Sequence, residues 1–285
     1  MIQRSSHRPH LRTLAALVVV VVVASCSSGG AGASGASTGS KVLDRIKAAG
    51  TLRAGYAAAL PWLGQDPKTN EYFGPNDLIG KKMAEKLGVK LERVTQTFDQ
   101  LIPALQAGTI DLAVAPMYMT EKRLAVIAMS AWSKGGFCYL VRKDDNRINK
   151  PADLNNAEIR IANFEGTGGF QETSKKYPLA KQVTRAAAPG EEAMFLEVQQ
   201  NKADAAAFDN PLAVVYEKQF PDLKIVPAAA ECLASPDIST DIGVGYPKDD
   251  AALTKFIEDI IKELAPQLKA ELEKYSDPKY LKPNG

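Results

Sequence analysis

The stretch Phe98-Asp-Gln-Leu-Ile-Pro-Ala-Leu-Gln-Ala-Gly-Thr-Ile-Asp-Leu-Ala-Val-Ala-Pro-Met-Tyr-Met-Thr-Glu-Lys-Arg123 predicts the architecture of the chain. It is typical of a short helix, a turn at Gly108, a buried strand and a polar loop that ends in an arginine. Open α/β sheets bind ligands beyond the carboxyl ends of their strands, which is where we expect Arg123. Because a guanidinium fits a carboxylate through two parallel hydrogen bonds, the stretch indicates capture of a small carboxylate. The alternative is a surface arginine that pairs with Glu121 or caps a helix.

The amino terminus has the pattern of a secretory signal. Arg4, Arg8 and Arg12 precede an apolar run at 14–24 that is too short to span a bilayer. Val23-Ala24-Ser25-Cys26 resembles a bacterial lipobox, in which the cysteine is acylated. The alternative is an ordinary cleavage site beside a chance cysteine. We expect a signal peptide at 1–25, a lipidated flexible tether at 26–41, and a membrane-anchored lipoprotein of the cell envelope that faces the periplasm or the cell exterior.

Charge and histidine content exclude several classes of function. Without the three signal arginines, 32 basic residues stand against 33 acidic ones, and no Lys/Arg block indicates a nucleic-acid partner. The two histidines, His7 and His10, lie in the signal, so we expect no histidine triad, no metal site and no cofactor. Cys138 and Cys232 could form a disulfide outside the cytoplasm or remain two buried thiols, and sequence leaves this open.

About 245 residues follow the tether, a length suited to two lobes. Strand–helix–strand units indicate parallel sheets, and Gly135-Gly136 and the run 239–246 look like crossings between lobes. We therefore predict an α/β fold of two Rossmann-like lobes, 42–135 plus 242–285 and 136–241, joined by a two-strand hinge. The expected strands are 51–56, 90–94, 110–115, 137–143, 159–162, 203–208, 223–226 and 239–246, and the expected helices are 42–49, 76–87, 100–106, 151–154, 170–176, 191–201 and 251–274, the last interrupted at Pro266.

Two polar positions in the second lobe could complete a site. Asp209 follows the expected strand 203–208 and could receive a ligand ammonium, or it could simply cap a helix before Pro211. The run Gly166-Thr167-Gly168-Gly169 precedes a helix, where free amides can hold an anion, or it could be a plain glycine turn. An anion-binding group in one lobe and an acidic side chain in the other would together fit a zwitterion held between the lobes.

Three aromatic residues could form a wall for an organic side chain: Tyr56, Trp62 and Phe98. The alternative for each is an ordinary core or rim position. An enzyme would need an activated acid, base or nucleophile, and Glu165 and Asp209 have no histidine or metal to support them. We therefore expect a binding protein with no catalytic residues.

With these residues in view, the chain resembles the polar amino-acid family of periplasmic solute-binding proteins, the group that binds glutamine, histidine or lysine/arginine/ornithine. The resemblance covers about residues 44–285, and its specific part is the run from Phe98 to Arg123. It rests further on Gly50-Thr-Leu-Arg-Ala-Gly-Tyr56, Gly74-Pro-Asn-Asp-Leu-Ile-Gly, Lys86-Leu-Gly88, Leu140-Val-Arg-Lys143, Gly166-Thr167 and Ala203-Asp-Ala with Asp209.

The resemblance implies roles for the candidate residues. Arg123 would hold the α-carboxylate and Asp209 the α-ammonium of an amino acid. Backbone groups near Pro116, Tyr118 and Gly168 would complete the grip, and Phe98 would stack on the ligand. Tyr56 stands where several family members carry an acidic or polar side chain that contacts the solute, and Asn76 stands where the family pattern Gly-Phe-Asp has its aspartate. It also implies a monomer that delivers its solute to the membrane permease of an ABC importer.

Departures from the family pattern change the expected solute. Pro116 stands at a usually small position and lacks an amide donor. Tyr118 replaces the usual threonine or serine and should crowd the cleft. Tyr56 and Asn76 replace acids, which favours a small or neutral amino acid, or a related carboxylate, over arginine or lysine. The alternatives are a periplasmic dehydratase or lyase on this scaffold, or a non-transport sensor.

Overall fold

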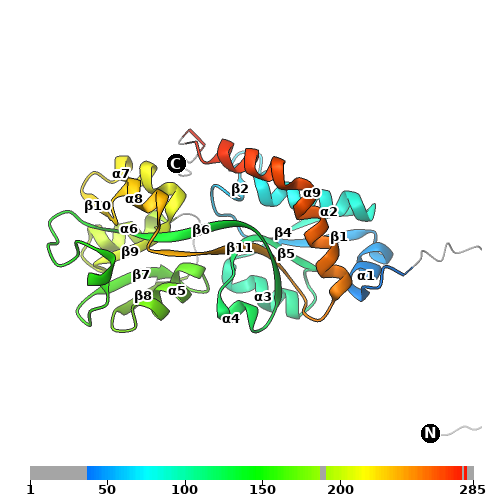
Figure 1. Ribbon diagram of the computed structural model, residues 1–285, viewed down its shortest axis with the longest axis horizontal. Helices are drawn as coiled ribbons and strands as arrows, with labels where there is room; N and C mark the ends of the chain where they lie inside the picture. Colours follow the sequence, from blue (N-terminus) through cyan, green and yellow to red (C-terminus); the bar gives the residue numbers. More distant parts are fainter. Residues whose placement is uncertain (1–36, 187–190, 278, 281–285) are drawn as a thin grey trace, which may run out of the picture. The chain divides into compact units, whose positions relative to one another are not determined.

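The computed structural model describes residues 37–186, 191–277 and 279–280 (Figure 1). The expected signal peptide, the lipobox with Cys26 and the greater part of the expected tether lie outside the described residues. Within the described residues, no helix has the length and apolar character needed to cross a membrane.

One nine-stranded sheet organises the described chain, in the order β4-β1-β5-β11-β6-β9-β7-β8, with β10 paired to β6 (Figure 1). Strands β2 and β3 form a separate two-stranded sheet. The strands are β1 (Thr51–Tyr56), β2 (Gly64–Gln65), β3 (Tyr72–Phe73), β4 (Lys90–Thr95), β5 (Leu112–Tyr118), β6 (Ala128–Arg142), β7 (Arg160–Phe164), β8 (Lys181–Arg185), β9 (Ala205–Asp209), β10 (Leu223–Val226) and β11 (Ile238–Tyr246).

The helices connect these strands. They are α1 (Lys41–Ala49), α2 (Pro75–Leu87), α3 (Phe98–Gln106), α4 (Glu121–Leu124), α5 (Gly168–Lys176), α6 (Glu192–Gln199), α7 (Ala213–Gln219), α8 (Ala229–Ala234) and α9 (Ala251–Tyr275), with short 3₁₀ turns η1 (Pro151–Leu154) and η2 (Asn210–Leu212).

Strands β6 and β11 run antiparallel through the middle of the sheet (Figure 1). β11 pairs with β5 and with the first half of β6, whereas the second half of β6 pairs with β9 and β10. At Gly136 an added Cβ would lie 2.0 Å from the carbonyl oxygen of Ile238, so the two strands approach there more closely than a side chain allows. These two strands are therefore the links between the sheet's two ends.

The two ends of the sheet repeat one βαβαβ arrangement. In the first repeat, β1 pairs in parallel with β4 and β5. In the second repeat, β7 pairs in parallel with β8 and β9. Each repeat has its first strand in the middle, and its second and third strands on either side. Consequently β5 and β9, the third strand of each repeat, occupy equivalent positions beside the crossing strands.

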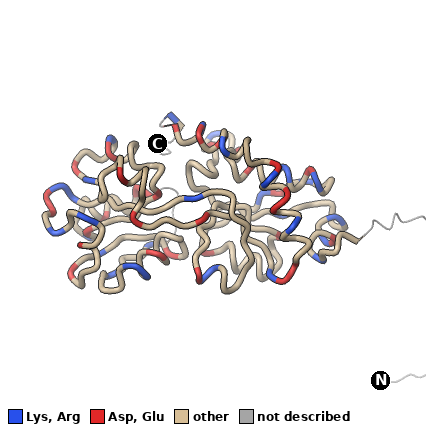
Figure 2. The backbone as a smooth tube through the Cα atoms, viewed as in Figure 1, with Lys and Arg blue, Asp and Glu red and all other residues tan. Residues whose placement is uncertain are grey.

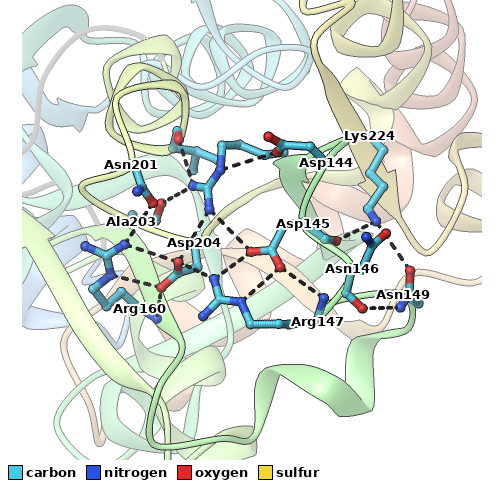
Figure 3. A network of polar contacts seen from close by, with 12 residues as sticks. Asp144, Asp145, Asn146, Arg147, Asn149, Arg160, Asn201, Ala203, Asp204 and Lys224 are labelled. Atoms are coloured by element: carbon cyan, nitrogen blue, oxygen red, sulfur yellow. Dashed lines mark hydrogen bonds and ion pairs between the residues drawn. The ribbon is translucent and has the colours of Figure 1, made fainter.

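A buried aspartate fixes each repeat in the same way. Asp111, just before β5, accepts the backbone N–H of Arg53 at 2.9 Å and also its guanidinium. Asp204, just before β9, accepts the backbone N–H of Arg160 at 2.9 Å and its guanidinium. Figure 3 shows that Asp204 also meets Arg147, which joins it to Asp145. Each pair thus locks the third strand of its repeat to the first.

Apolar side chains fill both ends of the sheet. One core joins residues of α1, β1, α2, β5, β11 and α9, and another joins residues of β6, β9, α6, α7, β10 and α8. Charged residues of both signs lie along α9 (Figure 2), and Glu263 of α9 pairs with Lys82 and Lys86 of α2. The expected interruption at Pro266 is wrong, because α9 is continuous. Leu264 and Leu268 on either side are buried, so packing outweighs the backbone hydrogen bond that proline removes.

The two cysteines that the sequence left undecided form a disulfide. The Sγ atoms of Cys138 in β6 and Cys232 in α8 are 2.12 Å apart, and their Cα atoms are 6.0 Å apart. The bond therefore ties α8 to the crossing strand, across 94 residues of sequence.

The folded part begins earlier than the expected tether end at residue 41. Ser40 caps α1 by accepting the N–H of Leu43 at 3.1 Å, and it donates to Asp250 at 2.6 Å. Thr38 donates to Asp44 through both its backbone N–H and its hydroxyl. The last residues of the expected tether, 37–41, are therefore part of the folded body.

Candidate functional site

The carboxyl ends of β5 and β9 meet through Tyr118 and Asp209. Tyr118 is the last residue of β5 and Asp209 the last of β9. The Tyr118 hydroxyl donates to Oδ1 of Asp209 at 2.8 Å, and the two residues are 6 % and 9 % exposed. The sheet therefore brings both side chains to the edge where α/β proteins bind ligands.

Arg123 lies beside them as a buried cation. The Thr120 hydroxyl caps α4 by accepting the Arg123 N–H at 3.3 Å. The guanidinium donates to the carbonyl oxygens of Tyr118 at 2.9 Å and Gly166 at 3.0 Å, and the residue is 1 % exposed. No Asp or Glu of the described residues lies within 4.0 Å of it. Burial consequently lowers the pKa of Arg123 to about 10, and an anion at this position would compensate the buried charge.

Asp209 has a second carboxyl group beside it. Glu191, which precedes α6, accepts the Asp209 N–H at 3.2 Å. Burial raises the pKa of Asp209 to about 7, and burial together with the charge of Asp209 raises that of Glu191. No Lys or Arg of the described residues lies within 4.0 Å of either carboxyl group. The site therefore has an acidic end. The sequence did not point to Glu191, because the helix that it precedes has an ordinary sequence.

The glycine-containing loop before α5 closes on Tyr118. Thr167 caps α5 by accepting the Phe170 N–H at 3.2 Å. A Cβ added to Gly168 would lie 2.7 Å from the Cβ of Tyr118, so only glycine permits this approach. Gly166 has a φ of 76° and offers its carbonyl oxygen to Arg123. In the structure this loop therefore supplies an acceptor to Arg123, whereas the sequence suggested amides for an anion.

Aromatic rings surround Tyr118. The centroid of the Phe137 ring lies 4.4 Å from that of Tyr118, and the Trp62 ring meets it edge-on at 6.1 Å. Trp62 is 1 % exposed, and its indole N–H has no hydrogen-bond acceptor among the described residues. The sequence pointed to Trp62 but not to Phe137, which lies on the crossing strand β6.

Two further candidates, Pro116 and Phe98, lie on β5 and α3. Pro116 is buried in β5, two residues before Tyr118, and so faces the same side of the strand. Phe98 is the first residue of α3 and is partly buried against a core that includes Leu101. Its neighbour Asp99 packs against Gly166, where an added Cβ would lie 2.5 Å from the Asp99 Cβ.

The Tyr56 side chain lies in the core rather than beside Tyr118. Tyr56 is fully buried in the core between β1 and α2, and its hydroxyl donates to Asp77 at 3.2 Å. Asn76 is also fully buried, and its side-chain amide donates to the carbonyl oxygen of Val114 at 3.4 Å. Neither side chain is brought to the Arg123, Tyr118 and Asp209 group. Position at a strand end is therefore insufficient to place a side chain in the site, because the side chain can point to either face of the sheet.

Additional polar contacts join α4 and the residue before it to α5. Thr120 donates to Gln171 at 2.5 Å, and Lys175 pairs with Glu121 at 2.6 Å. Glu165, considered as an acid–base group, is exposed to solvent. The described residues contain no cluster of three or more His, Cys, Asp or Glu that could hold a metal ion. The chemistry of the Arg123, Tyr118 and Asp209 group therefore suits a ligand that carries opposite charges at its two ends.

Comparison with known proteins gives a family match. The model of the bacterial extracellular solute-binding proteins, family 3, matches residues 52–277. A glutamine-binding protein of Geobacillus stearothermophilus is 28 % identical over 195 residues, which are 67 % of this chain and 72 % of that protein.

Solved structures agree with the family match. The arginine-bound form of truncated ArgBP from T. maritima is 32 % identical, with a TM-score of 0.63 over 78 % of this chain and 99 % of that one. An ancestral amino acid-binding protein, a precursor of cyclohexadienyl dehydratase, is 29 % identical, with a TM-score of 0.67 over 82 % of this chain and 99 % of that one. These likenesses confirm the expected α/β fold of the type II periplasmic binding proteins.

Proposed function

This chain belongs to the bacterial extracellular solute-binding proteins of family 3, and from that premise we propose that it captures an amino acid, or a related small carboxylate, for an ABC importer. The proposed solute spans the site as a zwitterion. Its carboxylate meets Arg123, and its ammonium meets Asp209.

The buried ionisable groups around Tyr118, which have no partner of opposite charge among the described residues, carry this proposal. Arg123 has no carboxylate partner among the described residues, and Asp209 and Glu191 have no cationic partner among them. Burying a charge without a partner costs free energy, and a zwitterion would offset that cost at both ends. Two charge-assisted contacts contribute roughly 1.5–3 kcal/mol each, which with aromatic packing is compatible with micromolar binding.

The proposed mechanism uses β6 and β11 as a hinge. The proposed lobes are 42–135 with 242–285, and 136–241. A solute that bridges Arg123 in one lobe and Asp209 in the other stabilises the closed arrangement only by its higher affinity for that arrangement than for the open one. The importer would then recognise the closed lobes of a monomer.

We also propose that the protein is held at the membrane by a lipid on Cys26, after removal of a signal at 1–25. The disulfide between Cys138 and Cys232 supports an oxidising compartment outside the cytoplasm. The test is expression of the full chain with a radiolabelled fatty acid. The wild type should carry label and sediment with membranes, and Cys26→Ser should do neither. A labelled Cys26→Ser protein would exclude this anchor.

Calorimetry tests the proposed solute class. We would titrate the protein with a panel of L-amino acids, including arginine and glutamine, and with deaminated and decarboxylated analogues of each amino acid that binds. The proposal expects 1:1 binding of an amino acid and a large loss with either analogue. Equal affinity for the deaminated analogue would remove Asp209 from its assigned role, and no binding across the panel would contradict amino-acid capture.

An enzyme of the dehydratase or lyase type is the second candidate, because one similar protein is a precursor of cyclohexadienyl dehydratase. Glu165 is exposed to solvent, so it does not give this candidate an acid–base group that is shielded from water. NMR of the same titrated samples separates the two candidates. An unchanged solute supports the receptor, and the appearance of a product supports the enzyme.

A further inference from the structure

The Tyr118 side chain stands between the two charged ends of the site. We propose that Tyr118 is a built-in competitor for the solute, whose phenol holds the two lobes together at Asp209 until an ammonium-bearing solute displaces it. The identity of the solute rests on the proposed function. The closure by Tyr118 does not, because it depends only on contacts within the chain.

The chain encloses the Tyr118 ring on several sides. A Cβ added to Gly135 would lie 2.7 Å from the Tyr118 hydroxyl, and one added to Gly168 would lie 2.7 Å from its Cβ. The rings of Phe137 and Trp62 flank it at centroid distances of 4.4 and 6.1 Å. On the sides of these two glycines there is no space even for a methyl group. A solute can therefore reach Asp209 along this side only if the phenol moves.

The contacts of Tyr118 connect the two repeats. Its hydroxyl, at the end of the first repeat, donates to Asp209 at the end of the second. Its carbonyl oxygen accepts from Arg123, whose other terminal nitrogen donates to Gly166 of the second repeat. Moving the phenol away from Asp209 therefore removes a buried contact between the proposed lobes.

The chemistry of the acidic end decides what can displace the phenol. A phenol is a neutral donor, so it cannot compensate a negative charge on Asp209 or Glu191. An ammonium group brings a positive charge as well as hydrogen bonds, and a nearby opposite charge favours the ionised form of a buried carboxyl group, which a neutral phenol cannot do. A carboxylate without an amine gains nothing at Asp209. Tyr118 thus makes the site selective for solutes that carry an ammonium group.

Competition by the phenol must lower the apparent affinity of the solute. A closed form that is stabilised without solute reduces the fraction of protein that can bind it. Removing the hydroxyl in Tyr118→Phe, while keeping the ring, should therefore raise the affinity for L-arginine, or whichever amino acid binds, by roughly tenfold.

Small-angle X-ray scattering of the protein without added solute tests the closure directly. Tyr118→Phe should have a larger radius of gyration than the wild type. The matched control is Tyr139→Phe, which also removes a phenol–aspartate bond, from Tyr139 to Asp237 at 3.1 Å, but one whose two residues both belong to the proposed lobe 136–241. That variant should keep the wild-type radius of gyration. Equal radii for the wild type and Tyr118→Phe would overturn the proposal.

Variants of the acceptor provide a second test should Tyr118→Phe fold poorly. Asp209→Asn keeps an oxygen that accepts from the phenol, so it should remain as compact as the wild type. Asp209→Ala removes the acceptor and should expand the protein as Tyr118→Phe does. Equal radii for Asp209→Ala and Asp209→Asn would contradict the role of the phenol.

Scattering and calorimetry together separate this proposal from the proposed function. If Tyr118→Phe expands and neither protein binds any amino acid of the panel, closure by Tyr118 stands and amino-acid capture falls. If the wild type binds an amino acid and Tyr118→Phe neither expands nor gains affinity, capture stands and the competitor role of Tyr118 falls.

Discussion

The hydroxyl of Tyr118 and the carboxylate of Asp209, 2.8 Å apart, join the ends of two strands that belong to different repeats. Asp209 is the group on which protonation bears most directly, because burial raises its pKa from 3.8 to about 7. It is faced by Tyr118 from β5, by Glu191 before α6 and by Tyr216 from α7.

We predict that affinity for an ammonium-bearing solute rises with pH. The folded, empty protein holds a proton on Asp209 below about pH 7, and an ammonium binds best to the ionised carboxylate. Affinity should therefore rise by up to about tenfold per pH unit from pH 5 toward 7, and level off above that range. Calorimetry at fixed ionic strength measures this dependence. Asp209→Asn should give a flat profile, and a flat profile in the wild type would show that Asp209 does not meet the ammonium.

The same raised pKa has a consequence for the empty protein. A carboxyl group whose pKa is higher in the folded state stabilises that state at low pH. The contribution of Asp209 is full below about pH 4 and is lost as the pH rises through about 7. We expect Asp209→Asn to remove this loss, so that its stability relative to the wild type increases between pH 5 and 8 in urea unfolding. An unchanged difference over that range would contradict the raised pKa.

Asp204 should behave in the opposite sense. Burial alone would raise its pKa, but hydrogen bonds from Arg160 and Arg147 outweigh burial and lower it to about 2. Its stabilising contribution is therefore present above about pH 4 and is lost as the pH falls toward 2. Asp204→Asn should reduce the free energy of unfolding at pH 7 by about 3 kcal/mol, because it leaves the arginines without their buried partner.

The matched control for Asp204 is an exposed carboxylate in a simple pair. Asp259 pairs with Lys255 on the surface of α9 at 2.9 Å. Asp259→Asn should change the free energy of unfolding by less than about 0.5 kcal/mol. Urea unfolding that gives similar losses for the two variants would mean that the Asp204 network is no more stabilising than an ordinary surface pair.

The disulfide should contribute strongly to stability because it closes a long loop. Cys138 and Cys232 are 94 residues apart, and closing a loop of that size lowers the entropy of the unfolded chain, which stabilises the folded state by about 4.7 kcal/mol. Cys138→Ala with Cys232→Ala should lower the free energy of unfolding by about that amount. A reducing agent should destabilise the wild type and leave the double variant unchanged. An equal loss of stability in the two proteins on reduction would show that the loss does not come from this disulfide.

Strands β1 and β11 were predictable from sequence, whereas β8 and the first half of β6 were not. The expected strands 51–56 and 239–246 match β1 and β11 to within one residue. β8 was missed because its residues Lys181–Arg185 are polar and largely exposed at the sheet's edge. The first half of β6 was missed because a strand that crosses between two cores has no single alternating pattern.

The site residues were predictable where their positions along the chain determined their places in the fold. Arg123 follows the buried strand β5 and Asp209 ends the buried strand β9, and α/β sheets bind ligands at this edge. Glu191 was missed because its position beside Asp209 depends on how α6 packs. Tyr56 ends a strand as Tyr118 does, but it points into the core toward Asp77. The sequence predicts where the strand ends, whereas packing against α2 determines the direction in which the Tyr56 ring points.

The most direct test of the central claim is calorimetric titration of an Arg123 variant. Arg123→Met keeps an unbranched buried side chain and removes the guanidinium, and Lys122→Met makes the same change at the exposed neighbouring position. For the amino acid that the wild type binds, we predict a loss of about 100-fold or more in Arg123→Met. Lys122→Met should bind as the wild type does. An Arg123→Met protein that folds and keeps wild-type affinity would contradict the account, because the solute's carboxylate would then be held elsewhere.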